Sequence, residues 1–550
     1  MPSPSSHLRA PLLWLLLPLA AGFAAAKHWP LPAAGPGPFL GAAAILALVA
    51  LVLAPQAGRR AHAGWAIALA GAVGLTGFVL LHARDPFLQE RPNRPPREVT
   101  LQLEVTRLFS PRAGSRSLSG LGRITAAGRN DGDLPGRTVQ FSAIRKVSVL
   151  PRDGARYVVQ GILQPLSADP VDAGFNDYLD NLGIHLQLAR AIIRREVSPP
   201  PALERLRVAA RGRLERILRR GLERHAPIAS LYLAMVLGEK AMLASDQQDA
   251  FMRSGTFHIF SVSGLHVGVI AGAIYTGISL LRVPRRTTTL LTLALLWLYV
   301  DVTGGGAPSI RSYLMIFFVF GARAFRLPGN HLAALTVAAL VTLLLDPMQL
   351  FTTGFQMSYL VMLALMAMAT PLGDKWAAGW HPFSNLPRAS WRWRHHVADF
   401  LGRKFLVAAA GCLVAFLAST PAGIAYFQLF SPGALAANLV VIPAASLALI
   451  SGFVSLVAGL AGLGPLSALF NSAAAVILLA INWAVSLSTQ LPGSWLAAHF
   501  RAGWMAPAAM AAMAAVLLAG AAVRWSPRWG GYWPPVALLA ATLIFLVKFG

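Results

Sequence analysis

Residues 256–272 read TFHIFSVSGLHVGVIAG, an apolar stretch that contains two serines and two histidines. On a continuous helix at about 100° per residue, Thr256, Ser263 and His266 share one arc. A polar arc of this kind suits a helix that lines an aqueous path, because unpaired polar groups in hydrocarbon are costly. Two other interpretations stay open. The side chains could hydrogen-bond to a neighbouring helix, or Ser263 and His266 could act as nucleophile and base, which usually also requires a third orienting group and an oxyanion site.

Small residues occupy the opposite side of the same predicted helix. Gly264, Gly268 and Gly272 recur every four residues and form one ridge. Ridges of small residues let two membrane helices approach closely. We therefore expect this ridge to pack against a neighbouring helix.

Polar residues also interrupt later apolar segments. Asp301 and Arg311 flank a Gly-Pro break in YVDVTGGGAPSIRSYLM, Gln356 lies in DPMQLFTTGFQMSYL, and Asn438 lies in FQLFSPGALAANLVVIP. Broken helices with polar groups at membrane depth are tolerated where they are buried in protein or line a cavity. Asp301 and Arg311 could instead pair with each other. The residues expected to line a channel are Thr256, Ser263, His266, Asp301, Arg311, Gln356 and Asn438.

The sequence contains no motif for nucleotide-dependent or metal-dependent catalysis. The glycines at 304–306 lack the Gly-Lys-Ser/Thr of a nucleotide-binding loop, and the chain has no His-x-His-x-Asp-His metal cluster. We therefore expect no catalytic residue, no bound metal and no cofactor, and we do not expect an enzyme.

Composition places the chain in the membrane. Of its 550 residues, 56% are hydrophobic and 13% are charged, whereas soluble domains contain about 25% charged residues. The pattern predicts a polytopic α-helical membrane protein with about thirteen spans. The predicted spans are 11–27, 38–55, 64–82, 256–281, 287–303, 309–325, 331–346, 354–371, 405–428, 434–460, 465–489, 504–522 and 533–548.

Basic residues concentrate in alternate short loops, including Arg59 and Arg60, Arg285 and Arg286, and the loop 372–404. The positive-inside rule then places the N-terminus in the cytoplasm. Because three predicted spans precede it, the segment 83–225 is expected outside the cytoplasm.

That segment changes its hydrophobic period. Five short alternating runs between residues 99 and 197, separated by Gly, Pro and Asp turns, predict a small β-barrel of the OB type. Such a barrel with a basic face would suit single-stranded nucleic acid, although few aromatic residues alternate with its arginines. Residues 201–224 predict an amphipathic helix, which would lie in the membrane interface or dock on the barrel.

These blocks carry a resemblance. LGEKAMLASDQQDAFMRSGTFHIFSVSGLHVGVIAG, at residues 238–272, resembles the signature of the ComEC family of DNA-internalisation proteins of natural competence. AGFNDYLDNLGI, DPMQLFTTGFQMSYL and FQLFSPGALAANLVVIP resemble other blocks of that family, in the same order. The resemblance implies an inner-membrane channel that passes one DNA strand into the cytoplasm. The chain departs from many relatives because it shows no metallo-β-lactamase-like domain, so a built-in nuclease is not expected.

With this resemblance, the chain divides into five predicted parts. They are N-terminal transmembrane helices at 1–82, an extracytoplasmic OB-like domain at 83–200, an interfacial helix at 201–227, a competence-type channel core at 228–490, and C-terminal transmembrane helices at 491–550. The expected partners are single-stranded DNA, a cytoplasmic DNA translocase or helicase, a periplasmic DNA-binding receptor, a separate nuclease, membrane lipid and a second copy of the chain. The alternative functions are transport of another anionic polymer or a lipid-linked substrate, and intramembrane serine hydrolysis.

Overall fold

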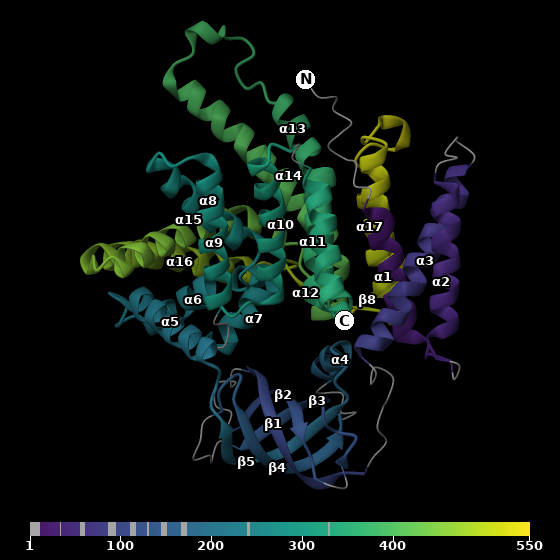
Figure 1. Cartoon of the computed structure of the whole chain (residues 1–550). Coiled ribbons are helices and arrows are strands. Elements are labelled where there is room, and N and C mark those ends of the chain that lie inside the picture. The colour runs from purple at the N-terminus through teal and green to yellow at the C-terminus, as the bar shows by residue number, and fades with distance from the viewer. Residues whose placement is uncertain are drawn as a thin grey trace. The chain divides into compact units, whose positions relative to one another are not determined.

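The computed structural model describes residues 12–32, 35–54, 61–85, 95–109, 117–128, 131–144, 151–166, 173–238, 243–327 and 330–550. The chain forms two compact units (Figure 1). One unit contains Pro11–Arg213 and Ala339–Thr352, and the other contains Leu214–Ala338 and Thr353–Gly550.

The first unit contains a closed five-stranded barrel. Its strands are β1 (Arg97–Phe109), β2 (Ser117–Ala126), β3 (Thr138–Ile144), β4 (Arg156–Pro165) and β5 (Leu186–Ser198). They pair in the order β1-β2-β3-β5-β4, and β4 closes the barrel against β1. All neighbours are antiparallel except β3 and β5. The predicted OB-like barrel is confirmed.

Alternation along the strands explains the barrel. In β1, residues Val99, Leu101, Leu103 and Val105 point inward and are buried, while the residues between them are more exposed. This period of two is what a strand with one buried face requires. The inward residues of all five strands form one apolar core, which includes the fully buried Tyr157. Helix α4 (Ala173–Asn181) lies between β4 and β5 in the chain.

Three N-terminal helices belong to the same unit: α1 (Leu13–His28), α2 (Gly37–Leu53) and α3 (Ala61–Arg84). Helices α1 and α3 pack closely because small residues face each other. A Cβ atom added at Gly22 would overlap the carbonyl oxygen of Gly74, and one at Gly77 would lie 2.9 Å from that of Leu19. The crossing therefore depends on glycine, as membrane helix contacts often do.

The second unit is helical. Its helices are α6 (Ala226–Leu237), α7 (Ser245–Arg253), α8 (Gly264–Leu280), α9 (Arg285–Val302), α10 (Ala307–Ala324), α12 (Thr353–Ala364), α13 (Thr370–Ala378), α14 (Trp393–Phe427), α15 (Ala434–Leu460), α16 (Gly464–Gln490), α17 (Met505–Ala522) and α18 (Pro534–Ala541). Helices α5 (Ala202–Arg219) and α11 (His331–Leu345) each contribute residues to both units.

Seven helical segments of the described residues are long and apolar enough to cross a membrane. They are Ala63–Arg84, Thr353–Ala378, Trp393–Phe427, Ala434–Leu460, Gly464–Gln490, Met505–Ala522 and Pro527–Leu546. Five shorter apolar helices accompany them, among them α1, α2 and α8. The chain is thus a multi-pass helical membrane protein with a barrel insert. The number of thirteen spans stays a prediction.

The predicted span 256–281 is wrong as a single helix. Helix α7 ends at Arg253, and Gly255 follows with a φ of +68°, a conformation that side-chain-bearing residues rarely adopt. A short 3₁₀ turn, Phe257–Phe260, comes next, and α8 begins only at Gly264. Hydropathy could not reveal the break because the turn is as apolar as the helix after it.

Two further features were not predicted. Helix α6, whose second half from Leu231 to Leu237 is buried, precedes the competence signature. A three-stranded sheet joins β6 (Leu429–Phe430), β7 (Leu496–Phe500) and β8 (Val547–Phe549), so the last predicted span ends in a strand.

Helix α5 is amphipathic, as predicted. Leu203 and Leu206, on one face of its first half, are 57% and 65% exposed, whereas Ile217 and Leu218 near its end are buried. The exposed apolar residues fit a helix at a membrane surface, because such a helix buries one face in lipid. Its interfacial location stays a prediction.

Candidate functional site

Ser263 and His266 contact each other at the start of α8. Ser263 occupies the N-cap position, and its Oγ lies 3.0 Å from Nδ1 of His266. The backbone N–H of Ser263 also donates to Nδ1, at 3.4 Å. His266 is fully buried. The pair therefore caps the helix, since a polar residue here supplies partners for backbone groups that the first turn leaves free.

Thr256 does not share a helical arc with Ser263 and His266. It lies in the turn before α8, fully buried, and its hydroxyl is 2.7 Å from that of Ser254. The adjacent Gly255 packs against Ala434 at the start of α15. One turn further along α15, the Oδ1 atom of Asn438 is buried without a hydrogen-bond partner. Thr256 and Asn438 thus belong to the same neighbourhood of the core.

The glycine ridge of α8 does not pack as predicted. A Cβ atom added at Gly268 or Gly272 would meet no atom within 4 Å, and one at Gly264 would meet only Ser312 Oγ, at 3.5 Å. All three glycines are exposed. The opposite side of α8, which includes Val267, Ile270 and Ile274, is the buried one. The spacing was compatible with packing, but it could not identify which face of the helix is covered.

The start of α10 contacts the start of α8. Ser309 Oγ donates to the carbonyl oxygen of Val262 at 2.9 Å, and Ser312 lies beside Gly264. The start of α12 also lies against α10, because a Cβ atom on Gly354 would be 3.9 Å from Pro308 and 3.3 Å from Arg311. The N-terminal ends of α8 and α12 therefore each lie against the start of α10. We call this region the three-helix junction.

Arg311 lies at the three-helix junction and is 1% exposed. Its Nη2 donates to the carbonyl oxygen of Gly354 at 2.6 Å, and its guanidinium carbon lies about 6 Å from the ring centres of Phe355 and Tyr359. Its Nε and Nη1 are buried without hydrogen-bond partners. Within the described residues its polar and ring contacts are with Gly354, Phe355 and Tyr359, and not with Asp301, the partner considered from the sequence.

Gln356 connects two spanning helices. The hydroxyl of Tyr426 on α14 donates to its Oε1 at 2.5 Å. Of the predicted channel residues, the structure therefore brings Ser263, His266 and Arg311 to the junction and places Thr256 near Asn438. It places Asp301 at the end of α9 and Gln356 at the contact of α12 with α14.

Asn471 was not predicted from the sequence. It is fully buried on α16, and its Nδ2 donates to the carbonyl oxygens of Ile217 at 2.8 Å and Arg220 at 2.9 Å. Its Oδ1 accepts from the hydroxyl of Tyr232 at 3.2 Å. The available signal was an asparagine inside a predominantly apolar helix, the same signal that identified Asn438.

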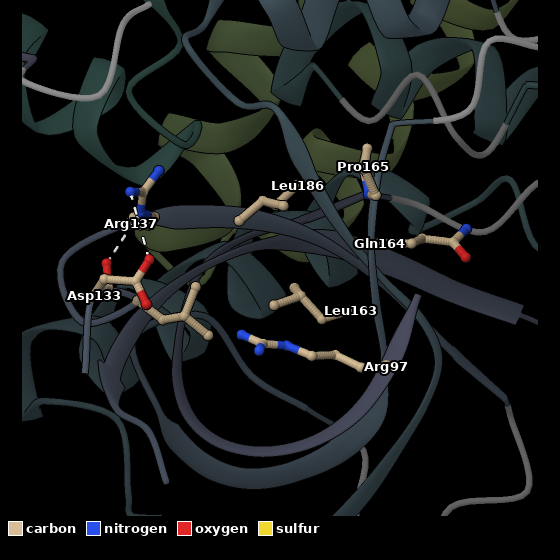
Figure 2. A pocket seen from close by; sticks show the side chains of 8 residues that line it. Arg97, Asp133, Arg137, Leu163, Gln164, Pro165 and Leu186 are labelled. Atoms are coloured by element: carbon tan, nitrogen blue, oxygen red, sulfur yellow. Dashed lines mark hydrogen bonds and ion pairs between the residues drawn. The ribbon is translucent and has the colours of Figure 1, made fainter. Parts of the chain in front are cut away.

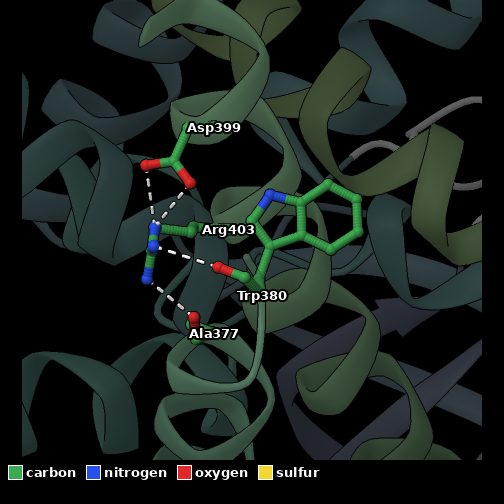
Figure 3. Close-up of polar contacts among 4 residues, drawn as sticks. All are labelled: Ala377, Trp380, Asp399 and Arg403. Carbon is green, nitrogen blue, oxygen red and sulfur yellow. Dashed lines mark hydrogen bonds and ion pairs between the residues drawn. The ribbon is translucent and has the colours of Figure 1, made fainter. Parts of the chain in front are cut away.

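Arg403 organises the basic loop between α13 and α14 (Figure 3). Its Nε lies 3.0 and 3.1 Å from the carboxylate oxygens of Asp399, and its other nitrogens donate to the carbonyl oxygens of Ala377 at 2.7 Å and Trp380 at 3.1 Å. One side chain therefore fixes the start of the loop against α14. The sequence identified the loop by its charge, not by this contact.

Aromatic side chains from two elements meet on the barrel. Phe109 at the end of β1 and Phe175 on α4 have ring centres 5.6 Å apart, and Tyr178 is 6.1 Å from Phe175. Arg107 donates to the Tyr178 hydroxyl at 3.4 Å and lies over Phe109. We call these four residues the aromatic patch. The sequence missed it because α4 and β1 are far apart in the chain.

A second barrel feature is a small pocket lined by Arg97, Asp133, Leu134, Arg137, Leu163, Gln164, Pro165 and Leu186 (Figure 2). Its arginines already have acidic partners. Arg97 forms an ion pair with Asp131, and Arg137 is 3.9 Å from the carboxylate of Asp133. The pocket therefore offers little unpaired positive charge to an anion, and the aromatic patch is the better candidate for nucleic acid.

Known proteins resemble the membrane core. The family model described as Competence protein matches residues 235–527, more than half of the chain. ComE operon protein 3 of Bacillus subtilis (strain 168) is 28% identical over 133 residues, which cover 24% of this chain and only 17% of that protein. No solved structure matches the chain significantly. On the extent of the family match, this chain belongs to the Competence protein family.

Proposed function

We propose that this chain conducts single-stranded DNA across the cytoplasmic membrane during natural transformation. The observation that carries the proposal is the family match over residues 235–527, which covers α7 to α17 and the three-helix junction. The match covers 17% of ComE operon protein 3, so DNA transport by this chain is our inference.

The barrel supports a single-stranded substrate. OB-type barrels bind single strands by stacking bases on aromatic rings while basic residues contact the backbone. The aromatic patch combines these features, since Phe175 is 39% exposed and Arg107 is exposed beside it. In a single strand the faces of the bases are accessible to an aromatic ring, whereas in a duplex neighbouring base pairs cover them. The patch therefore favours a single strand.

The membrane core supports a path for a polyanion. Three helices begin inside this unit, after the breaks at Gly255, Gly304–Gly306 and Thr352. Transporters use such broken helices to point N-terminal ends, which carry partial positive charge, at anionic substrates. A buried arginine at the same point adds a full positive charge.

Transport needs a source of work. Each phosphate carries a negative charge, and moving one charge through 100 mV takes about 2.3 kcal/mol. A potential that is negative inside opposes entry of every phosphate. We propose that a cytoplasmic translocase or helicase pulls the strand and docks near the loop 372–404, whose start Arg403 holds in place. A periplasmic receptor would deliver the DNA, and a separate nuclease would remove the other strand.

The test uses a naturally transformable strain in which this gene replaces the resident one. Fluorescent DNA should reach the cytoplasm as a single strand, and deletion should stop entry while DNA still binds outside. Normal transformation after deletion would exclude the proposal. Transport of another polymer or a lipid-linked substrate would then be examined, and labelling of Ser263 by serine-reactive probes would favour a hydrolase.

A further inference from the structure

The three-helix junction has the electrostatics of an anion site. Helices α8, α10 and α12 have 17, 18 and 12 residues, and each carries partial positive charge at its N-terminal end. Backbone N–H groups in the first turn of a helix bind phosphate readily where they have no other partner. At α8 Ser263 already caps the first turn, and at α10 Pro308 has no N–H and the Ser309 N–H donates to the carbonyl oxygen of Gly306, so the donors left for a ligand are few. The ends of α8 and α12 each lie against the start of α10 here, through the contacts of Ser309 with Val262 and of Arg311 with Gly354.

Arg311 supports an anion site independently of the helix ends. A buried charge is expected to be paired, because leaving it unpaired in an apolar interior is strongly unfavourable. Its guanidinium makes one hydrogen bond, to Gly354, and leaves Nε and Nη1 buried without partners. The planar guanidinium matches two oxygens of a phosphate, which makes arginine the side chain suited to this anion. The unused donors therefore point to an anionic ligand that completes the site.

Two glycines at the junction are exposed. Gly264, the first residue of α8, and Gly306, the N-cap of α10, are both exposed. Gly304 and Gly305 turn the chain into α10 with φ values of +95° and +55°. With no side chains in this turn, a ligand can approach the backbone closely.

We propose that the three-helix junction binds a phosphate group, held by Arg311 and the N-terminal ends of α8, α10 and α12. The assignment of that phosphate to the DNA backbone rests on the proposed function. The site would then hold one phosphodiester of the strand at a time inside the membrane core and compensate its charge there.

The first measurement is calorimetry on the full-length protein in maltoside, a detergent without phosphate. The probes are dimethyl phosphate, inorganic phosphate and a short oligothymidylate. The wild type should bind dimethyl phosphate, and Arg311→Gln should bind it about tenfold more weakly or worse, since charge-assisted hydrogen bonds are lost. Arg403→Gln is the matched control, because Arg403 is already fully engaged by Asp399, Ala377 and Trp380. No phosphate binding by the wild type overturns the proposal.

A second pair of variants remains informative if Arg311→Gln does not fold. Gly306 has an ordinary φ of −56°, and a Cβ atom there would meet its neighbours at 3.8 Å, so a side chain fits. Asparagine and aspartate are both good N-cap residues. Gly306→Asn should bind dimethyl phosphate like the wild type, and Gly306→Asp several-fold more weakly, because only aspartate adds a negative charge. Equal binding by both variants contradicts the site.

The source of the phosphate is decided separately. Phosphatidylglycerol added to the micelles should not displace dimethyl phosphate, whereas oligothymidylate should. Displacement by the lipid alone would assign the site to a headgroup and overturn the DNA assignment. These measurements involve no transport, so they test the phosphate site separately from the proposed function. If the protein binds phosphate but its deletion leaves transformation intact, the proposed function is refuted and the site is not.

Discussion

Asn471 illustrates how single polar residues hold the membrane core together. It is buried, and it joins α16 to the end of α5 and to Tyr232 on α6 through three hydrogen bonds. Removing one partner of a buried hydrogen bond leaves the other unsatisfied, at about 1–3 kcal/mol. Asn471→Ala should therefore lower the free energy of unfolding by about that amount, measured in detergent with a denaturant.

Asn438→Ala is the control for this prediction. The Oδ1 atom of Asn438 has no hydrogen-bond partner to lose, so its replacement should change the free energy of unfolding less. An equal loss in the two variants would contradict the role given to Asn471.

Asp153 belongs to the barrel and gives a pH dependence. Burial raises the pKa of its carboxyl group, although the Leu108 N–H donates to it at 2.8 Å and opposes the shift. Because the folded pKa is above the unfolded value, the stabilisation is complete below the unfolded pKa and is lost as the pH rises through the folded pKa. Asp153→Asn keeps the acceptor for Leu108 without the charge.

The variant should thus gain stability relative to the wild type as the pH rises from about 4 to neutrality. Hydrogen exchange of the β1 amides in the full-length protein, compared between the two proteins across this range, measures the difference. A relative loss of protection in the variant at neutral pH would give the opposite sign and contradict the assignment.

At the scale of the element, the aromatic patch should bind bases. Phe175 is partly exposed on α4, so Phe175→Ala should leave the barrel folded and weaken binding of single-stranded DNA by the full-length protein. Stacking of one base contributes about 1–3 kcal/mol, which is about a fivefold to hundredfold change in affinity. Phe175→Trp should retain binding.

Arg107→Gln should act differently. It removes one phosphate contact, so the slope of log affinity against log salt should fall by about one. Unchanged affinity in both Phe175→Ala and Arg107→Gln would exclude the patch as a DNA contact.

The sequence of α8 predicted that its glycine ridge packs against another helix, and the structure predicts the opposite. Gly268 faces open space within the chain, so Gly268→Leu should introduce no clash and should favour the helix by up to about 1 kcal/mol. Gly452→Leu on α15 is the contrast, because a Cβ atom there would already lie 3.0 Å from the Tyr232 hydroxyl. Thermal unfolding in detergent should rise or stay constant for Gly268→Leu and fall for Gly452→Leu.

A clear loss of stability in Gly268→Leu would mean that the ridge is covered, for example by a second copy. Mass spectrometry of the intact detergent complex would then show fewer dimers in this variant. Either result would identify which face of α8 packs.

Periodicity in a sequence encodes which face of a helix or strand is buried, and little else. Alternation in β1 and the turns between strands predicted the barrel, because burial of one strand face leaves a local pattern. The break before Gly264 and the sheet β6-β7-β8 left no such pattern, since the turn and each strand are too short for a period to be recognised. The polar residues Ser263, Arg311 and Gln356 were recognisable by type, but their partners Gly354 and Tyr426 are set by tertiary packing. The aromatic patch was missed for the same reason.

For the whole molecule, the central claim is that the chain forms a path for single-stranded DNA. The most direct measurement is entry of a short fluorescent strand into liposomes that contain the purified protein and a trapped single-strand-binding protein, without a membrane potential. The trap removes the need for a motor, because binding inside draws the strand inward. The account predicts protein-dependent entry of single-stranded DNA and little entry of duplex of the same length. No entry above protein-free liposomes, or equal entry of both forms, would contradict it.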